Sequence, residues 1–192
     1  MKSDLLFKYL LIAASGLLLS SCQENQPSPF QQKPIASLHA VMTGIIDPAV
    51  DPLWESVSVE VSAEGVVEHA PQTDEEWAEV RGHALRLVEA TNLLLIKGRN
   101  IVNPGETVSD TDVEGVNNAD EIARAINDQY DAYAAHVQAL RSATERTLVA
   151  IDAKDHVALE KAGGEIEHAC EGCHTAFWYP GTTHPAAPVA AK

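Results

Sequence analysis

The sequence predicts an all-α fold, and within that class an antiparallel up-and-down four-helix bundle. Hydrophobic residues make up 45 % of the 192 residues but aromatic residues only 5 %, a mixture that favours packed helices over a sheet. Apolar residues recur at helical spacing in four successive segments. Short connections on one side join these segments, as is usual for an up-and-down bundle. The length suits one domain with a substantial core.

The first 21 residues read as an export signal that precedes the fold. Lys2 and Lys8 flank the start, and the apolar run Leu10–Leu19 is too short to span a bilayer. The run leads into LSSC at residues 19–22, which resembles a bacterial lipobox. This resemblance implies cleavage before Cys22 and lipidation of Cys22. An ordinary signal peptide that happens to contain a cysteine is the alternative.

Residues 22–34 are polar and proline-rich, and we interpret them as a flexible tether between lipid and domain. The helical domain is expected over residues 35–179, and residues 180–192 are expected to form a disordered tail. These segments predict a protein anchored by lipid on the periplasmic side of a bacterial membrane. Without the lipid, the same protein would be soluble in the periplasm.

The first helix is expected to break at Asp47-Pro48 and Asp51-Pro52 and then to restart, because proline suits a first helical turn. Its apolar stripe comprises Leu38, Val41, Met42, Ile45 and Ile46 before the break and Leu53, Trp54 and Val57 after it.

The other three helices have recognisable ends. Residues 62–72 read as a connection, after which Thr73 and Glu76 form a capping-box pattern and Gly98 is a plausible stop. A polar stretch leads to a third helix beginning near Asn118, and Asp155 can cap a fourth helix that ends before residue 180. The three expected apolar stripes are Trp77, Val80, Ala84, Leu87, Thr91, Leu94 and Leu95; then Ile122, Ile126, Tyr130, Tyr133, Val137, Leu140 and Leu148; then Leu159, Ala162, Ile166 and Ala169.

The strongest chemical motif is CEGCH at residues 170–174. A thioredoxin-like redox pair would want a βαβ context, and a zinc site would want about four ligands. A structural disulfide between Cys170 and Cys173 stays open but gives His174 no role. Attachment of one covalently bound haem c uses all three residues. Positions i, i+3 and i+4 share a helix face, so both thiols can form thioethers while His174 ligates the iron.

The late CxxCH, the four helical segments and the pattern VMTGIIDPAVDPLW at residues 41–54 together resemble the class II c-type cytochromes, the cytochrome c′ and cytochrome c556 family. The resemblance covers about residues 35–179. It implies a haem in the bundle core between the first and last helices. It also implies a choice at the sixth iron position: a methionine on the first helix in the c556-like branch, or an apolar side chain that leaves the iron five-coordinate in cytochrome c′ proper.

Met42 lies on the first helix and is the candidate sixth ligand, although a methionine in an apolar stripe can also be core filler. His39 could face the same side, but a solvent-facing position is the simpler expectation for it. We therefore expect a haem-containing electron-transfer protein with His174 and Met42 as iron ligands. The alternative is a five-coordinate haem protein that binds NO or CO.

Several supporting roles are also expected. Gly163 and Gly164 in the last helix predict close approach of another helix or a bend. Residues 110–121 match most of an EF-hand calcium loop, but Glu114 at position five, Asn117 at position eight and the lack of a helix leading into the loop favour an acidic surface loop that caps the third helix. The candidates for holding haem propionates are Arg81, Arg86 and Arg99, and those for shielding the haem edge are Phe177 and Trp178.

The net charge of −15 predicts repulsion from nucleic acid, so we expect no nucleic-acid partner. The expected partners are redox proteins, and a homodimer is an open possibility. No nucleophile, base or substrate cleft can be read from the sequence, so a catalytic enzyme is the least favoured interpretation.

Overall fold

The computed structural model describes residues 32–63 and 65–182. The chain divides into two units, Met1–Gln32 and Lys33–Lys192, and the description concerns the second. The export signal, Cys22 and most of the tether therefore lie outside the described residues, as does the end of the tail from residue 183. Within the described ranges, no helix combines the length and the apolar character needed to cross a bilayer.

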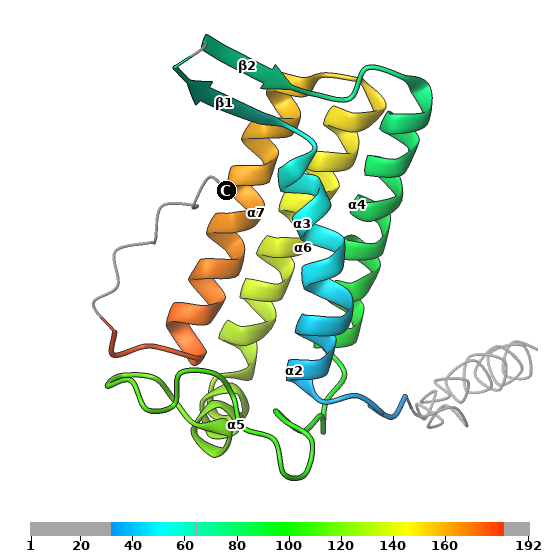
Figure 1. Cartoon of the computed structure of the whole chain (residues 1–192). Helices are drawn as coiled ribbons and strands as arrows, with labels where there is room; N and C mark the ends of the chain where they lie inside the picture. Colours follow the sequence, from blue (N-terminus) through cyan, green and yellow to red (C-terminus); the bar gives the residue numbers. More distant parts are fainter. Residues whose placement is uncertain (1–31, 64, 183–192) are drawn as a thin grey trace, which may run out of the picture. The chain divides into compact units, whose positions relative to one another are not determined.

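Four helical rods lie side by side and run alternately up and down (Figure 1). When the rods are counted along the chain, the third rod packs against the second and the fourth rods. The first rod also contacts the second and the fourth rods. The structure is mostly helical, which confirms the predicted class in its coarse form. The first rod comprises α2 (Leu38–Val41), η1 (Met42–Ile46) and α3 (Asp47–Glu55), the others are α4 (Asp74–Leu94), α6 (Tyr130–Asp152) and α7 (His156–Phe177), and α5 (Ala119–Asp128) precedes α6.

The first rod is continuous, so the predicted break at Asp47-Pro48 is wrong. Its middle section η1 is a π-helix, in which the N–H of Asp47 donates to the carbonyl of Met42. A π turn is wider than an α turn, and this one lies where Pro48 supplies no N–H to the helical ladder. The π turn adds one residue to this stretch of the rod. Ile46 lies on the buried face beside Val41, whereas Ile45, which the predicted apolar stripe included, is 38 % exposed.

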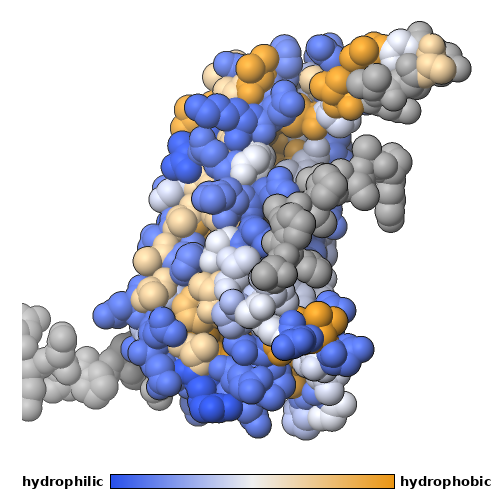
Figure 2. All heavy atoms as spheres, turned by 90° about the vertical axis from the view of Figure 1, so that its left-hand side faces the viewer, coloured by the Kyte–Doolittle hydropathy of each residue, from blue (hydrophilic) through white to orange (hydrophobic). Residues whose placement is uncertain are grey.

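A β-hairpin departs from the all-α expectation. Strand β1 (Ser58–Ser62) pairs antiparallel with β2 (Gly65–His69), where a simple connection was predicted. The alternation of valine with polar residues along SVEVS suits a strand, as does the β-branched pair Val66-Val67. Val59, Val66 and Val67 are at least half exposed, and Figure 2 shows apolar side chains on this hairpin above a largely hydrophilic face.

The predicted third helix is divided in two. Gln129 has φ −125° and ψ 40°, which ends α5 and begins α6. The start near Asn118 is confirmed, because the Asn118 side chain accepts from the N–H of Glu121 at 3.1 Å and the Glu121 carboxylate accepts from the N–H of Asn118 at 2.8 Å. The Thr73–Glu76 capping box is also confirmed. Asp155 caps α7 by accepting from the N–H of Ala158 at 3.0 Å.

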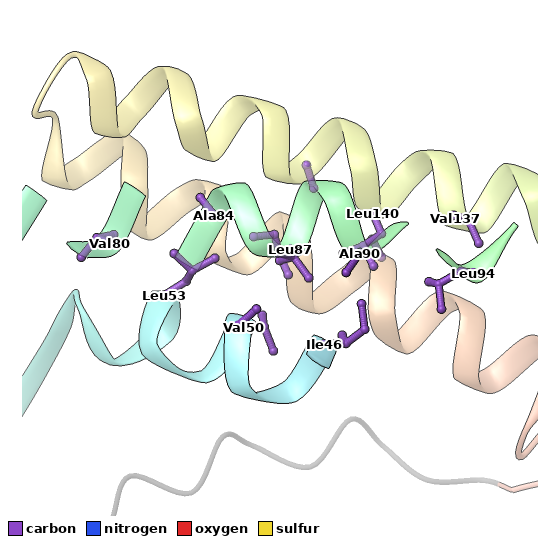
Figure 3. Close-up of a cluster of buried hydrophobic side chains, with 14 of the residues drawn as sticks. Ile46, Val50, Leu53, Val80, Ala84, Leu87, Ala90, Leu94, Val137 and Leu140 are labelled. Carbon is purple, nitrogen blue, oxygen red and sulfur yellow. The ribbon is translucent and has the colours of Figure 1, made fainter. Parts of the chain in front are cut away.

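The core lies between the four rods. In Figure 3, side chains of α3, α4 and α6 point toward one another, with Leu53 of α3 and Leu87 of α4 among them. Both are almost fully buried, as is Ile166 from α7. The predicted stripe of α7 is buried throughout, and that of α4 is buried except at Leu95. Burial of this kind supplies about 1.5–3 kcal/mol for each large side chain.

The loop between α4 and α5 forms hydrogen bonds with two segments that adjoin the candidate site, the start of α2 and the segment after α7. Its carbonyls at Asn100 and Ile101 accept from the N–H groups of Leu38 and His39 at the start of α2. The same loop holds the segment after α7, which is described under the site below. Its acidic residues do not form a metal cluster: in the described part of the chain, no three His, Cys, Asp or Glu side chains gather in a metal-binding arrangement.

Candidate functional site

Three residues of the CEGCH motif share one side of the last turns of α7. Cys170, Cys173 and His174 all line a single cavity, as their spacing predicts. Met42 of η1 lies on the wall of the same cavity. The first and last rods therefore bring two thiols, an imidazole and a thioether together, although these residues are separated by more than half of the chain.

The remaining cavity wall is mostly apolar and comes from all four rods. The first rod supplies Ile46, Val50 and Trp54, while α4 and α6 supply leucine, valine and aromatic side chains. Such a wall excludes water from whatever the thiols and the imidazole hold. The complete lining is Met42, Ile46, Asp47, Val50, Trp54, Leu94, Tyr133, His136, Val137, Leu140, Ala169, Cys170, Cys173 and His174.

The two thiols are protonated at neutral pH. Burial raises the pKa of Cys170 to about 12, and Cys173 and Asp47 add to the shift. Burial raises the pKa of Cys173 to about 11. Thiol–disulfide exchange requires a thiolate, so these surroundings are the opposite of those found in redox-active cysteine pairs. The environment thus disfavours the thioredoxin-like interpretation of the motif.

His174 is kept neutral and is enclosed by aromatic rings. Burial lowers its pKa, and the negative charge of Glu171 opposes that shift in part. A neutral imidazole is the form that binds a metal. The ring centre of Trp178 lies 5.3 Å from that of His174, edge to face, and the ring centre of Tyr179 lies 6.1 Å away.

Met42 reaches the cavity from the start of the π segment in the first rod. It is the first residue of η1, and its carbonyl accepts the π-type hydrogen bond from Asp47. Its side chain is half-buried against the main core. The chain contains two methionines, and the other is Met1. His39, the other candidate on this helix, does not line the cavity.

His136 is a cavity residue that the sequence analysis missed. It lies on α6, with its ring edge-on to Phe177 at a centroid distance of 5.8 Å. Helical spacing could have predicted that His136 faces the core, because His136 is three residues after Tyr133 and four before Leu140 on a buried face. Asp47 is a second missed residue, and burial followed by the charge of Asp51 raises its pKa.

The first and last rods are in direct contact at a point on α7 that precedes the CEGCH motif. The indole N–H of Trp54 donates to the carbonyl of Gly163 at 3.0 Å. A Cβ at Gly163 would lie 3.4 Å from Trp54 Cδ1, which is the edge of ordinary van der Waals contact, so the two rods approach closely here without requiring a glycine. Nothing lies within 4 Å of a Cβ at Gly164, and close approach does not account for that residue.

Two buried donors near the cavity have no hydrogen-bond partner among the described residues: Arg99 Nε and Trp178 Nε1. Arg99 lines a second pocket together with Lys97, and this pocket shares Leu94 and Tyr133 with the thiol-containing cavity. An unpaired buried donor on a cation suits an anionic group. Of the other two arginines considered above, Arg81 is paired with Asp152 at 2.7 Å, and Arg86 contacts His83 at 2.9 Å.

These features fit a covalently attached haem. The donor set combines two neutral thiols for thioether bonds with a neutral imidazole on the same helix face. The thioether of Met42 offers a sixth ligand from the facing rod. The largely apolar wall suits a porphyrin, and Arg99 offers a cation for a propionate.

Comparisons with known proteins give a partial match. No protein-family model matches the chain, and no curated protein matches it. Two solved structures of similar helical architecture are point variants of cytochrome c prime from Alcaligenes xylosoxidans, each in complex with nitric oxide. Both are 15 % identical to this chain over 73 % of its length, they are covered to 89 % and 88 %, and the TM-scores are 0.47 and 0.46.

Proposed function

We propose that this protein carries one haem c and transfers electrons. Cys170 and Cys173 would attach the porphyrin, while His174 and Met42 would ligate the iron. The observation that carries this proposal is the convergence of these four side chains on one cavity from the first and last rods. When bound, the haem iron would cycle between its ferrous and ferric states.

The chain's own residues would hold the cofactor and keep its surroundings constant. Val50 and Leu140 on facing rods help to keep water out of the cavity. The bond from Trp54 to Gly163 ties the first rod, which carries Met42, to α7, which carries His174. Arg99 would pair with a propionate and thereby satisfy its buried Nε. A rigid site of this kind favours electron transfer, because little rearrangement accompanies a change of charge.

A second candidate function is reversible binding of a small gas such as NO or CO. Ile46 and Val50 line the same wall as Met42. If Met42 packs as an apolar side chain and does not ligate iron, this wall would leave an exchangeable sixth position. The proposed electron carrier and the gas-binding protein thus differ in the role of one residue.

The cellular context is part of the proposal. The LSSC sequence at residues 19–22 supports lipidation of Cys22 and a tether to the periplasmic side of a bacterial membrane. The partners would be redox proteins, with no substrate turned over by the protein itself. A homodimer remains an open form of assembly within this proposal.

Optical spectroscopy of the haem-loaded ferric protein distinguishes the two functions. Ligation by Met42 predicts a low-spin spectrum with a methionine-to-iron charge-transfer band, and slow binding of CO by the ferrous form. A high-spin ferric spectrum with rapid CO binding would support the gas-binding function and would contradict the proposed one.

A further inference from the structure

The chain folds back over His174 immediately after α7 ends. The backbone N–H groups of Trp178 and Tyr179 both donate to the carbonyl of His174, at 2.7 and 3.0 Å. This brings the rings of both residues against the imidazole. We call residues 178–182 the proximal strap.

The strap also reaches back to the motif itself. The hydroxyl of Tyr179 donates to the carboxylate of Glu171 at 2.6 Å. Glu171 is the first residue between the two motif cysteines and lies three residues before His174, so both are neighbours on the surface of α7. A hydrogen bond from a hydroxyl to a carboxylate at this distance is of the strong, charge-assisted type.

The loop before α5 holds the strap in place from outside. The backbone N–H of Asn117 donates to the carbonyl of Trp178 at 2.7 Å, and the Asn117 side chain donates to the carbonyl of Phe177 at 2.9 Å. The N–H of Gly181 donates to the carbonyl of Gly115 at 3.2 Å. Tyr179 is therefore fixed by contacts on both sides of its position in the strap.

We propose that Glu171, positioned by the hydroxyl of Tyr179, provides a fixed negative charge behind His174 and lowers the reduction potential of the site. This inference rests on the proposed haem function. A fixed negative charge near the iron favours the ferric over the ferrous state, because the ferric site carries one more positive charge. Tyr179 acts through Glu171 and is therefore a positioning residue.

The test compares reduction potentials of haem-loaded proteins: the unchanged protein, Glu171→Gln, Tyr179→Phe, the double variant and a control, Glu160→Gln. Glu160 is an exposed carboxylate about three turns earlier in α7, farther from His174 than the Debye length of about 10 Å in 0.1 M salt. Each sample is first assayed for covalently bound haem. Absence of haem from the unchanged protein would refute the proposed function itself, whereas the potentials test only the role of Glu171.

With haem bound, Glu171→Gln should raise the reduction potential, and Tyr179→Phe should raise it by a smaller amount because the carboxylate can then turn toward solvent. In the Glu171→Gln background, Tyr179→Phe should have no further effect. The control should keep the original potential. The inference is overturned if Glu171→Gln and Glu160→Gln have the same potential, or if the effects of Glu171→Gln and Tyr179→Phe are additive in the double variant.

Discussion

The indole of Trp54 on α3 donates a hydrogen bond of 3.0 Å to the backbone carbonyl of Gly163 on α7. This bond joins segments that are far apart in the chain, and it lies about two turns from Cys170 along α7. It ties the rod that carries Met42 to the rod that carries His174.

Replacing Trp54 by phenylalanine should lower the free energy of unfolding by about 1 kcal/mol, the typical net value of one hydrogen bond. Urea unfolding followed by circular dichroism measures the change. An unchanged urea midpoint for Trp54→Phe would contradict the role given to this contact.

The strap provides a second stability prediction. Gly115 has φ +91°, and a Cβ there would lie 2.7 Å from the carbonyl oxygen of Gly181. Gly105 has a similar φ of +88° but nothing within 4 Å of the corresponding Cβ. Gly105→Ala should cost about 1 kcal/mol for backbone strain, and Gly115→Ala should cost about 1–3 kcal/mol more because of overlap.

Urea unfolding of the two alanine variants side by side makes this comparison, with Gly105→Ala as the matched control. Equal losses would show that the strap is not held against the loop. A larger loss for Gly115→Ala should be accompanied by a change in the optical spectrum of the haem, because the strap contacts His174.

The raised thiol pKa values predict a loss of stability in alkali for chain produced without haem. Cys170 and Cys173 titrate near 12 and 11 when folded, against a reference value of 9.0. As pH rises, the unfolded chain loses these protons first, so the stabilising contribution is complete below about pH 9 and disappears as pH approaches 11 to 12. Urea unfolding at a series of pH values measures this loss.

The control for that series is the haem-free double variant Cys170→Ser, Cys173→Ser, whose stability should fall less between pH 8 and 11. If both proteins follow the same pH curve, the thiols are not buried as described. A rise in stability between about pH 7 and 9 would instead indicate activated thiolates, which lose their protons more readily in the folded than in the unfolded chain, and would favour a redox-active cysteine pair.

Much of the fold follows from local sequence signals. The α4 and α7 stripes have regular spacing, and Thr73 and Asp155 cap helices in the way that their own side chains dictate. The missed features depend on contacts between distant segments. The π register at Met42 and the Gly115–Gly181 contact are of this kind, because a periodicity analysis assumes α-helical turns and does not see partners across the fold.

The candidate site was predictable to a similar extent. The CEGCH spacing places Cys170, Cys173 and His174 together by helix geometry alone. Met42 was selected because the family resemblance implies a methionine on the first helix and Met42 lies in the apolar stripe of that helix, and the structure places it on the cavity wall. The Glu171–Tyr179 bond could not be read from the sequence, because Tyr179 lies beyond the helix end and reaches Glu171 only after the chain reverses.

Substituting the proposed sixth ligand should change the spin state of the iron. Met42→Ala is expected to convert a low-spin ferric spectrum to a high-spin one and to open the ferrous iron to rapid CO binding. Ile45→Ala is the matched control, since Ile45 lies on the same rod but is 38 % exposed. A low-spin spectrum that survives in Met42→Ala would exclude Met42 as the ligand.

The most direct test of the central claim, haem attachment at Cys170 and Cys173, is a pyridine haemochrome spectrum of protein purified from a host that matures c-type cytochromes. The account predicts the spectrum of a haem whose two vinyl groups have both formed thioethers, with the colour retained after denaturation. Colourless protein with two free thiols at these positions would contradict it.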